Sequence, residues 1–133
     1  MNNQILVVED HKAIRILLSN FLGKSFAVKT VSNGFEGIAW MNDGNFPHLI
    51  ILDINMPNLG GIEFLMNLRN SGFFENIPVI VVSAEENGAV IEKCIELGIS
   101  GYLKKPFDPN ELKKKILTIF DKNRNPLNIS IGQ

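Results

Sequence analysis

The chain has 133 residues, of which 45% are hydrophobic and 20% are charged, a balance typical of a globular domain rather than a disordered or fibrous chain. Thirteen basic residues against fourteen acidic ones leave a formal net charge of -1, which argues against nucleic-acid binding by this domain alone. The single cysteine excludes an internal disulfide framework and favours a reducing, cytoplasmic setting, and no segment approaches the ~20 apolar residues of a membrane span.

In the first half of the chain, short apolar runs alternate with amphipathic stretches. β-branched runs bounded by polar residues indicate buried strands, and apolar residues at helical spacing between them indicate helices. The pattern predicts, in chain order, a strand at 5–8, a helix at 11–23, a strand at 26–31, a helix at 34–42 and a strand at 49–52 that ends at Asp53.

The second half continues the alternation after a turn-rich loop at 55–61. The pattern predicts a helix at 62–70, a strand at 77–82, a helix at 87–97, a strand at 100–103 and a helix at 109–121. Gly98 is expected to cap the fourth helix and Asp108 to cap the fifth at its N-terminus. Five strands that alternate with five helices imply a doubly wound (βα)5 fold with a five-stranded parallel sheet. We expect one domain at 1–122, with 123–133 as a tail or the start of a linker.

Polar and charged side chains follow the predicted strands at the points where the strands end. In an open α/β sheet, ligands bind at the carboxyl ends of the strands, so these side chains are expected to share one site. A single acid at a strand end is more often a helix cap or a solvated charge, but several groups at one edge indicate a binding site. The groups are Glu9, Asp10, Asp53, Ser83, Lys104 and Lys105.

The chemistry of this set favours phosphoryl transfer at a magnesium site. Three crowded acids need a cation or shared protons, and oxygen ligands favour a hard ion such as Mg²⁺. Asp53 is the natural nucleophile because carboxylates form aspartyl-phosphates. A lysine supplies a point charge for an anion, Ser83 supplies a hydroxyl donor, and the backbone carbonyl of Asn55 is a candidate for completing the coordination of the ion.

Four motifs together resemble the receiver domain of two-component response regulators, over about residues 3–122. They are ILVVED, LIILDINMPNLGG, PVIVVSA and GYLKKPF. The resemblance implies the flavodoxin-like strand order 2-1-3-4-5, for which a chemotaxis member of this family is a standard example. It also implies a domain that accepts a phosphoryl group from a sensor histidine kinase and later catalyses its own dephosphorylation.

The resemblance assigns roles to individual residues. Asp53 matches the phospho-acceptor; Ser83 and Lys105 match the hydroxyl and the lysine that contact the phosphoryl group. The Mg²⁺ ligands implied are Glu9, Asp10, Asp53 and the backbone of Asn55. The Lys105–Pro106 peptide bond is expected to be cis, and Tyr102 occupies the aromatic switch position that responds when Ser83 moves.

The partners implied are a sensor histidine kinase or phosphotransfer protein and a downstream protein target or output domain. The family also forms homodimers through the surface of the fourth helix, fifth strand and fifth helix, which is the surface expected to switch. Neither nucleic acid nor a membrane is expected as a direct partner. The alternative function is a receiver-like interaction module that works without phosphorylation.

Two rival functions fit the residues less well. A haloacid dehalogenase-type phosphatase requires a second acid two residues after the nucleophile, where this chain has Asn55, and a flavodoxin requires a polar phosphate loop where it has acids. Among the remaining residues, His11 follows the acidic pair and could border the site, but it is expected to be a first-turn helix residue without a catalytic role. Phe73 and Phe74 are expected to be buried under the loop that contains them, with an exposed patch as the alternative.

Overall fold

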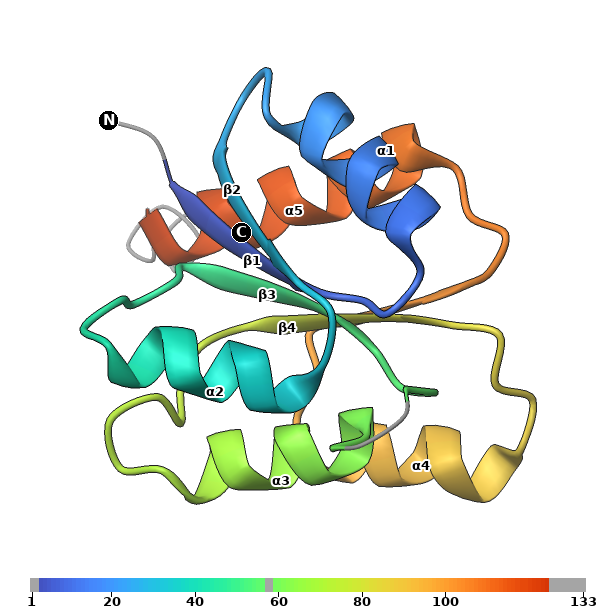
Figure 1. Cartoon of the computed structure of the whole chain (residues 1–133). Helices are drawn as coiled ribbons and strands as arrows, with labels where there is room; N and C mark the ends of the chain where they lie inside the picture. Colours follow the sequence, from blue (N-terminus) through green and yellow to red (C-terminus); the bar gives the residue numbers. More distant parts are fainter. Residues whose placement is uncertain (1–2, 57–58, 125–133) are drawn as a thin grey trace, which may run out of the picture.

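The computed structural model describes residues 3–56 and 59–124, with the side chains of the last two excepted. The predicted five strands and five helices are present and alternate along the chain (Figure 1). The first five elements are β1 (Gln4–Val8), α1 (Lys12–Leu22), β2 (Ala27–Val31), α2 (Gly34–Asn42) and β3 (Leu49–Asp53). The others are α3 (Gly61–Asn70), β4 (Val79–Ser83), α4 (Gly88–Glu96), β5 (Gly101–Lys104) and α5 (Pro109–Arg124).

The strands form one parallel sheet in the order β2-β1-β3-β4-β5, which confirms the doubly wound fold and its strand order. β1, β3 and β4 lie inside the sheet, and β2 and β5 form its edges. The inner strands are almost entirely buried, whereas the edge strands are partly exposed. This explains why the inner strands read as continuous apolar runs without a polar face.

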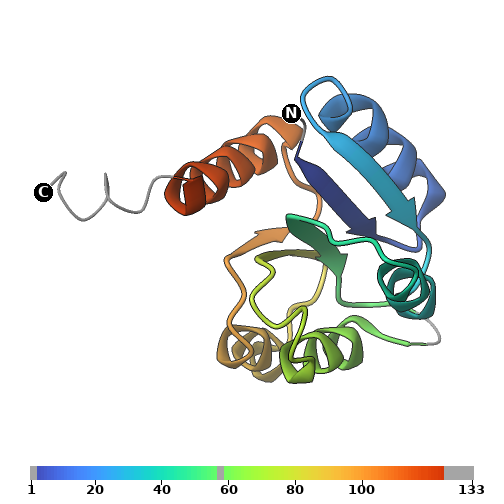
Figure 2. The same cartoon turned by 90° about the vertical axis from the view of Figure 1, so that its left-hand side faces the viewer.

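Helices cover both faces of the sheet, α1 and α5 on one and α2, α3 and α4 on the other (Figure 1, Figure 2). Alternate residues of each strand point to opposite faces, so one strand contributes to two cores. In β3, Leu49 and Ile51 pack with the α1 and α5 side, while Ile50 and Leu52 pack with α2, α3 and α4. The two cores hold the strand ends in fixed positions, and the site is built on those ends.

Several predicted boundaries differ from the observed ones. β4 begins at Val79 rather than at residue 77, because Pro78 precedes the ladder and has no N–H to donate. β2 begins at Ala27, one residue later than expected, and α5 continues to Arg124, beyond the expected 121. The rest of the predicted tail, 125–133, and residues 57–58 of the predicted loop lie outside the described residues.

Two predicted helix caps are visible in the backbone geometry. The carboxylate of Asp108 accepts a hydrogen bond from the Asn110 amide at 2.9 Å, at the start of α5. Gly98 follows the end of α4 with a φ of 75°, the left-handed conformation that glycine adopts without a steric penalty. These local signals end and start helices where the chain must turn back to the sheet.

The prediction that Phe73 is buried is wrong. Its side chain is 72% exposed, and Phe46 from the loop before β3 is 47% exposed. The rings of Phe73 and Phe74 are 4.9 Å apart, and each lies 5.2 to 5.5 Å from the ring of Phe46. Phe74 is partly buried and packs against the core, while the rings of Phe46 and Phe73 pack on it from the solvent side. Within the described part of the chain, no helix is long and apolar enough to cross a bilayer.

Candidate functional site

The centre of the site is formed by β1 and β3, the neighbouring strands at which the strand order reverses. Asp53 is the last residue of β3, and Glu9 directly follows β1. Because Val8 pairs with Leu52 in the sheet, the next residues of the two strands lie side by side. Glu9 and Asp53 are each only 1% exposed. The sheet thus buries two carboxylates in the crevice where doubly wound folds bind their ligands.

Lys105 places an ammonium group between these two acids. Its Nζ lies 3.0 Å from Oε1 of Glu9 and 3.4 Å from Oδ2 of Asp53. The peptide bond to Pro106 is cis, and the Lys105 amide donates to the Ser83 carbonyl at 2.9 Å. Lys104 instead forms a surface ion pair of 3.3 Å with Glu86. Of the two adjacent lysines, Lys105 is therefore the one in contact with the buried acids.

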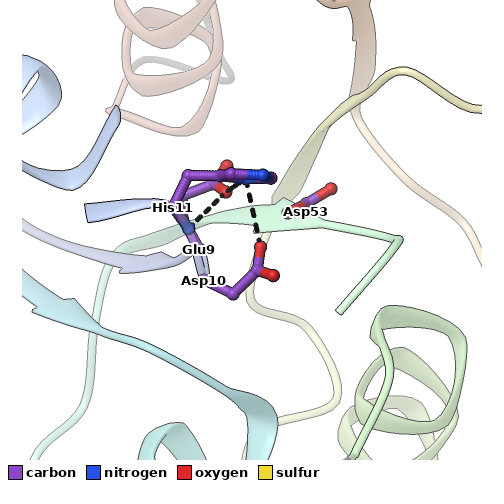
Figure 3. Close-up of side chains that lie close together, drawn as sticks. All are labelled: Glu9, Asp10, His11 and Asp53. Atoms are coloured by element: carbon purple, nitrogen blue, oxygen red, sulfur yellow. Dashed lines mark hydrogen bonds and ion pairs between the residues drawn. The ribbon is translucent and has the colours of Figure 1, made fainter. Parts of the chain in front are cut away.

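The acids have spare ligand atoms that face one another. Glu9, Asp10, His11 and Asp53 each offer an atom, and these atoms all lie within 4.8 Å of one another (Figure 3). Glu9 Oε1, Asp10 Oδ1 and Asp53 Oδ2 are shielded from solvent and accept no hydrogen bond. A buried carboxylate oxygen without a hydrogen-bond donor requires a positive charge nearby. Lys105 supplies one such charge, and the donor set fits a divalent cation with oxygen ligands.

Burial sets the electrostatics of Asp53. Removal from water, together with the neighbouring Glu9 carboxylate, raises the pKa of Asp53 from 3.8 to about 7. The charge of Lys105 and the Asn55 amide act in the opposite direction and lower this pKa. The carboxylate is therefore poorly stabilised by the protein alone near neutral pH. An added cation would stabilise its ionised, nucleophilic form.

The loop after β3 holds Asp53 from the other side. The amide of Asn55 donates to Oδ1 of Asp53 at 3.2 Å, while the Asn55 side chain is exposed. Gly61 packs its backbone against the same strand end, since a Cβ on it would stand 2.5 Å from the Asp53 carbonyl oxygen and from the Ile54 Cα. The glycine therefore permits α3 to begin directly beneath the carboxylate.

Ser83 and Tyr102 are linked through one loop residue. Ser83 is fully buried at the end of β4, and its Oγ accepts the amide of Glu85 at 3.0 Å. The hydroxyl of Tyr102 donates to the Glu85 carbonyl at 3.3 Å. A movement of the Ser83 hydroxyl would therefore change the position of the group that holds Tyr102.

Two residues that sequence reasoning did not assign to the site contact its acidic loop. Arg15 donates from one guanidinium nitrogen to the carbonyls of Glu9 and Asp10, at 2.8 and 2.9 Å. His11 is not in the first turn of α1, as predicted, but precedes the helix as its N-cap; its imidazole lies against both acids, which agrees with the alternative that it borders the site. For Arg15 the only sequence signal was helical spacing, which places its side chain one turn after residue 11.

A family model described as the response regulator receiver domain matches residues 5–117 of the chain. The chain belongs to this family. The receiver is 32% identical to the chemotaxis protein CheY of Pseudomonas aeruginosa over 121 residues, which cover 90% of this chain and 97% of that protein.

Similar segments also occur within larger proteins. The chain is 32% identical over 115 residues to the hybrid signal transduction histidine kinase D of Dictyostelium discoideum. The matched residues cover 86% of this chain but only 7% of that protein. Among solved structures, the chemotaxis protein CheY4 of Vibrio cholerae matches with a TM-score of 0.81 and 28% identity. That match covers 89% of this chain and 98% of the other. Receivers thus occur as nearly whole proteins and as parts of long ones.

Proposed function

We propose that this receiver accepts a phosphoryl group on Asp53 from a sensor histidine kinase or a phosphotransfer protein, with Mg²⁺ bound beside it. The observation that carries the proposal is the contact of Lys105 with the buried carboxylates of Glu9 and Asp53, which lie in one cluster with Asp10. The receiver would act in the cytoplasm, where its kinase domain partner and ATP are available. It is proposed to catalyse the transfer and the later hydrolysis rather than to process a metabolite.

In the proposed transfer, an oxygen of Asp53 attacks the phosphorus of a phosphohistidine. The bond between phosphorus and the histidine nitrogen breaks, the new bond from phosphorus to the carboxylate oxygen forms, and the histidine nitrogen takes up a proton. Dephosphorylation is the attack of water on the same phosphorus, which returns the carboxylate and releases inorganic phosphate. Little covalent chemistry is required of the other residues, so their contribution is positioning and charge neutralisation.

The residues around Asp53 supply that positioning. Glu9, Asp10, Asp53 and the backbone of Asn55 would hold Mg²⁺, which when bound neutralises charge on the carboxylate and on the phosphoryl oxygens. Lys105 would follow the transferred group, exchanging part of its contact with Asp53 for a phosphoryl oxygen. Ser83, whose side chain is buried at the end of β4, would donate its hydroxyl to another phosphoryl oxygen.

The same movement is proposed to send the signal. If Ser83 turns toward the phosphoryl group, its bond to the Glu85 amide weakens and the carbonyl that holds Tyr102 shifts. Tyr102 then turns inward and changes the surface of α4, β5 and α5. Phosphate thus shifts a two-state equilibrium, and the changed surface contacts a downstream target, an output domain or a second copy of the receiver.

The test is intact-mass measurement after incubation with acetyl phosphate, with and without Mg²⁺. The expected result is one added phosphoryl group that requires Mg²⁺ and is absent in Asp53→Asn. Labelling that persists in Asp53→Asn would remove the assignment of the acceptor. No labelling of the wild-type protein under any condition would favour the alternative, an interaction module that works without phosphorylation.

A further inference from the structure

His11 occupies a position that most helices give to another kind of residue. It is the N-cap of α1, yet its side chain makes no capping hydrogen bond. Serine, threonine, aspartate and asparagine are favoured there because their oxygens accept the free amides of the first turn. A residue that departs from this local rule without a local benefit indicates a functional requirement.

The imidazole of His11 turns toward the carboxylates instead of the helix. Its Nδ1 lies 2.8 Å from Oε2 of Glu9 and 3.2 Å from Oδ1 of Asp10, as Figure 3 shows. The His11 amide also donates to Oε2 of Glu9 at 3.0 Å, which fixes the backbone under the ring. The ring is therefore held at the edge of the acidic cluster, with its side chain 62% exposed to incoming ions.

The cluster has the dimensions of a metal site with mixed ligands. One nitrogen and three carboxylate oxygens lie within 4.8 Å of one another. Ligands on opposite sides of a divalent ion stand about 4 Å apart when each bond is about 2.1 Å, so small movements would close the site. Oε1 of Glu9 and Oδ2 of Asp53 are buried and form no hydrogen bond, and the ammonium of Lys105 at 3.0 and 3.4 Å is the one positive charge beside them among the described residues. Three carboxylates against that one ammonium leave negative charge that a divalent ion would balance.

Nitrogen and oxygen ligands select different ions. Mg²⁺ prefers oxygen ligands and retains several waters, whereas imidazole suits zinc, copper, iron and nickel. We propose that His11 is a further metal ligand of this receiver, and that its imidazole makes the acidic site bind divalent transition ions such as Ni²⁺ in preference to Mg²⁺. This inference rests on the proposed function only in using the same cation site.

The experiment measures Ni²⁺ and Mg²⁺ binding by calorimetry at about pH 8, because metal binding competes with protons for the ligands. The proteins are the wild type, His11→Asn and His48→Ala. Asparagine is a favoured N-cap, so His11→Asn keeps the start of α1 while removing the imidazole. His48 is the matched control, because it is the only other histidine in the sequence. Its Nδ1 accepts the Gln4 amide at the amino-terminal ends of β1 and β3, whereas the acidic site is at their carboxyl ends.

The expected result is that His11→Asn weakens Ni²⁺ binding by at least about tenfold. Mutating a residue that only hydrogen-bonds to a metal ligand already lowers metal affinity by about tenfold or more, and here the ligand itself is removed. Its Mg²⁺ affinity should stay within about twofold, and His48→Ala should match the wild type for both ions. Proton NMR gives a second readout, because an imidazole bound to paramagnetic Ni²⁺ shows strongly shifted ring signals. These signals should be present in His48→Ala and absent in His11→Asn.

Equal Ni²⁺ affinity in the wild type and His11→Asn, or shifted imidazole signals that persist in that variant, would overturn the inference. Acetyl phosphate labelling with Mg²⁺ on the same samples separates this failure from that of the proposed function. If labelling proceeds while His11 has no effect on Ni²⁺, only the role of His11 falls. If neither ion binds and labelling fails, the cation site itself is refuted together with the inference.

Discussion

Replacing Asp53 with asparagine is expected to stabilise the fold at alkaline pH, although the residue is at the centre of the site. Asparagine keeps the size of the side chain and the oxygen that accepts the Asn55 amide, and it removes a buried charge. Lys105 retains its 3.0 Å contact with Glu9. The variant therefore separates the energetic cost of the buried carboxylate from its packing.

The magnitude follows from the pKa of Asp53. The value rises from 3.8 to about 7 on folding, a shift of about three units, and each unit corresponds to about 1.4 kcal/mol. Between these two values the folded protein holds a proton that the unfolded chain has lost, so the stability of the wild type falls as pH rises through this range. Above about pH 7 the buried carboxylate is ionised, and the cost levels off at about 4 kcal/mol.

The assay is urea unfolding of the wild type and Asp53→Asn in EDTA, at several pH values. The free energy of unfolding of Asp53→Asn should exceed that of the wild type by about 4 kcal/mol near pH 8, and by less than half of this near pH 5. Adding Mg²⁺ at the higher pH should stabilise the wild type more than the variant, because an ion that binds the folded state shifts the equilibrium toward it.

Asp121→Asn is the matched control, because it removes an exposed carboxylate from α5. It should change the free energy of unfolding by less than about 0.5 kcal/mol. A difference between the wild type and Asp53→Asn that stays constant with pH would refute the reasoning. So would an Asp53→Asn variant that is less stable than the wild type near pH 8.

Three further substitutions test how the structure supports the site. Gly61→Ala should lower the free energy of unfolding by about 2 kcal/mol or more and slow acetyl phosphate labelling, because its Cβ would stand 2.5 Å from backbone atoms at the end of β3. Gly72→Ala is the control and should leave the free energy of unfolding nearly unchanged, because its Cβ would have no atom within 4 Å. Arg69→Met should lower the free energy of unfolding measured in urea by about 2–4 kcal/mol, because the guanidinium donates to four backbone carbonyls around the ends of α3 and α4. A decrease below about 0.5 kcal/mol would contradict this prediction. Phe64→Ala should lower the free energy of unfolding by about 3–5 kcal/mol, and Phe73→Ala by about 1 kcal/mol or less, because the Phe64 side chain is 1% exposed and the Phe73 side chain 72%. Equal losses of stability in thermal unfolding would show that the exposure argument is wrong.

The fold could be predicted from the sequence because its signals are local. Apolar runs such as the one ending at Val8 indicate strands that are buried on both faces, and helical periodicity fills the gaps between them. The bounds of a strand or helix differ from the prediction where a single residue overrides the hydrophobic pattern. Pro78 shortened β4 because it lacks an amide hydrogen, an effect that periodicity does not contain.

The candidate site could be predicted in composition but not in geometry. Parallel strands bring Glu9, Asp53 and Ser83 to one edge by topology alone, so their grouping follows once the sheet is parallel. The resemblance already assigned Lys105 and a cis Lys105–Pro106 bond, but the 3.0 and 3.4 Å distances from Lys105 to Glu9 and Asp53 depend on the pairing of β4 with β5. Those are properties of the folded chain.

Sequence alone therefore determined the family, the order of elements and the residue types at the strand ends, because each depends on neighbours in the chain. Tertiary structure decided which side chains are exposed and how charges meet. It left Phe73 in solvent, turned the ring of His11 onto two carboxylates and buried Asp53 beside Glu9. The physical reason is that burial and charge pairing depend on groups far apart in sequence, which only the packed sheet and helices bring into contact.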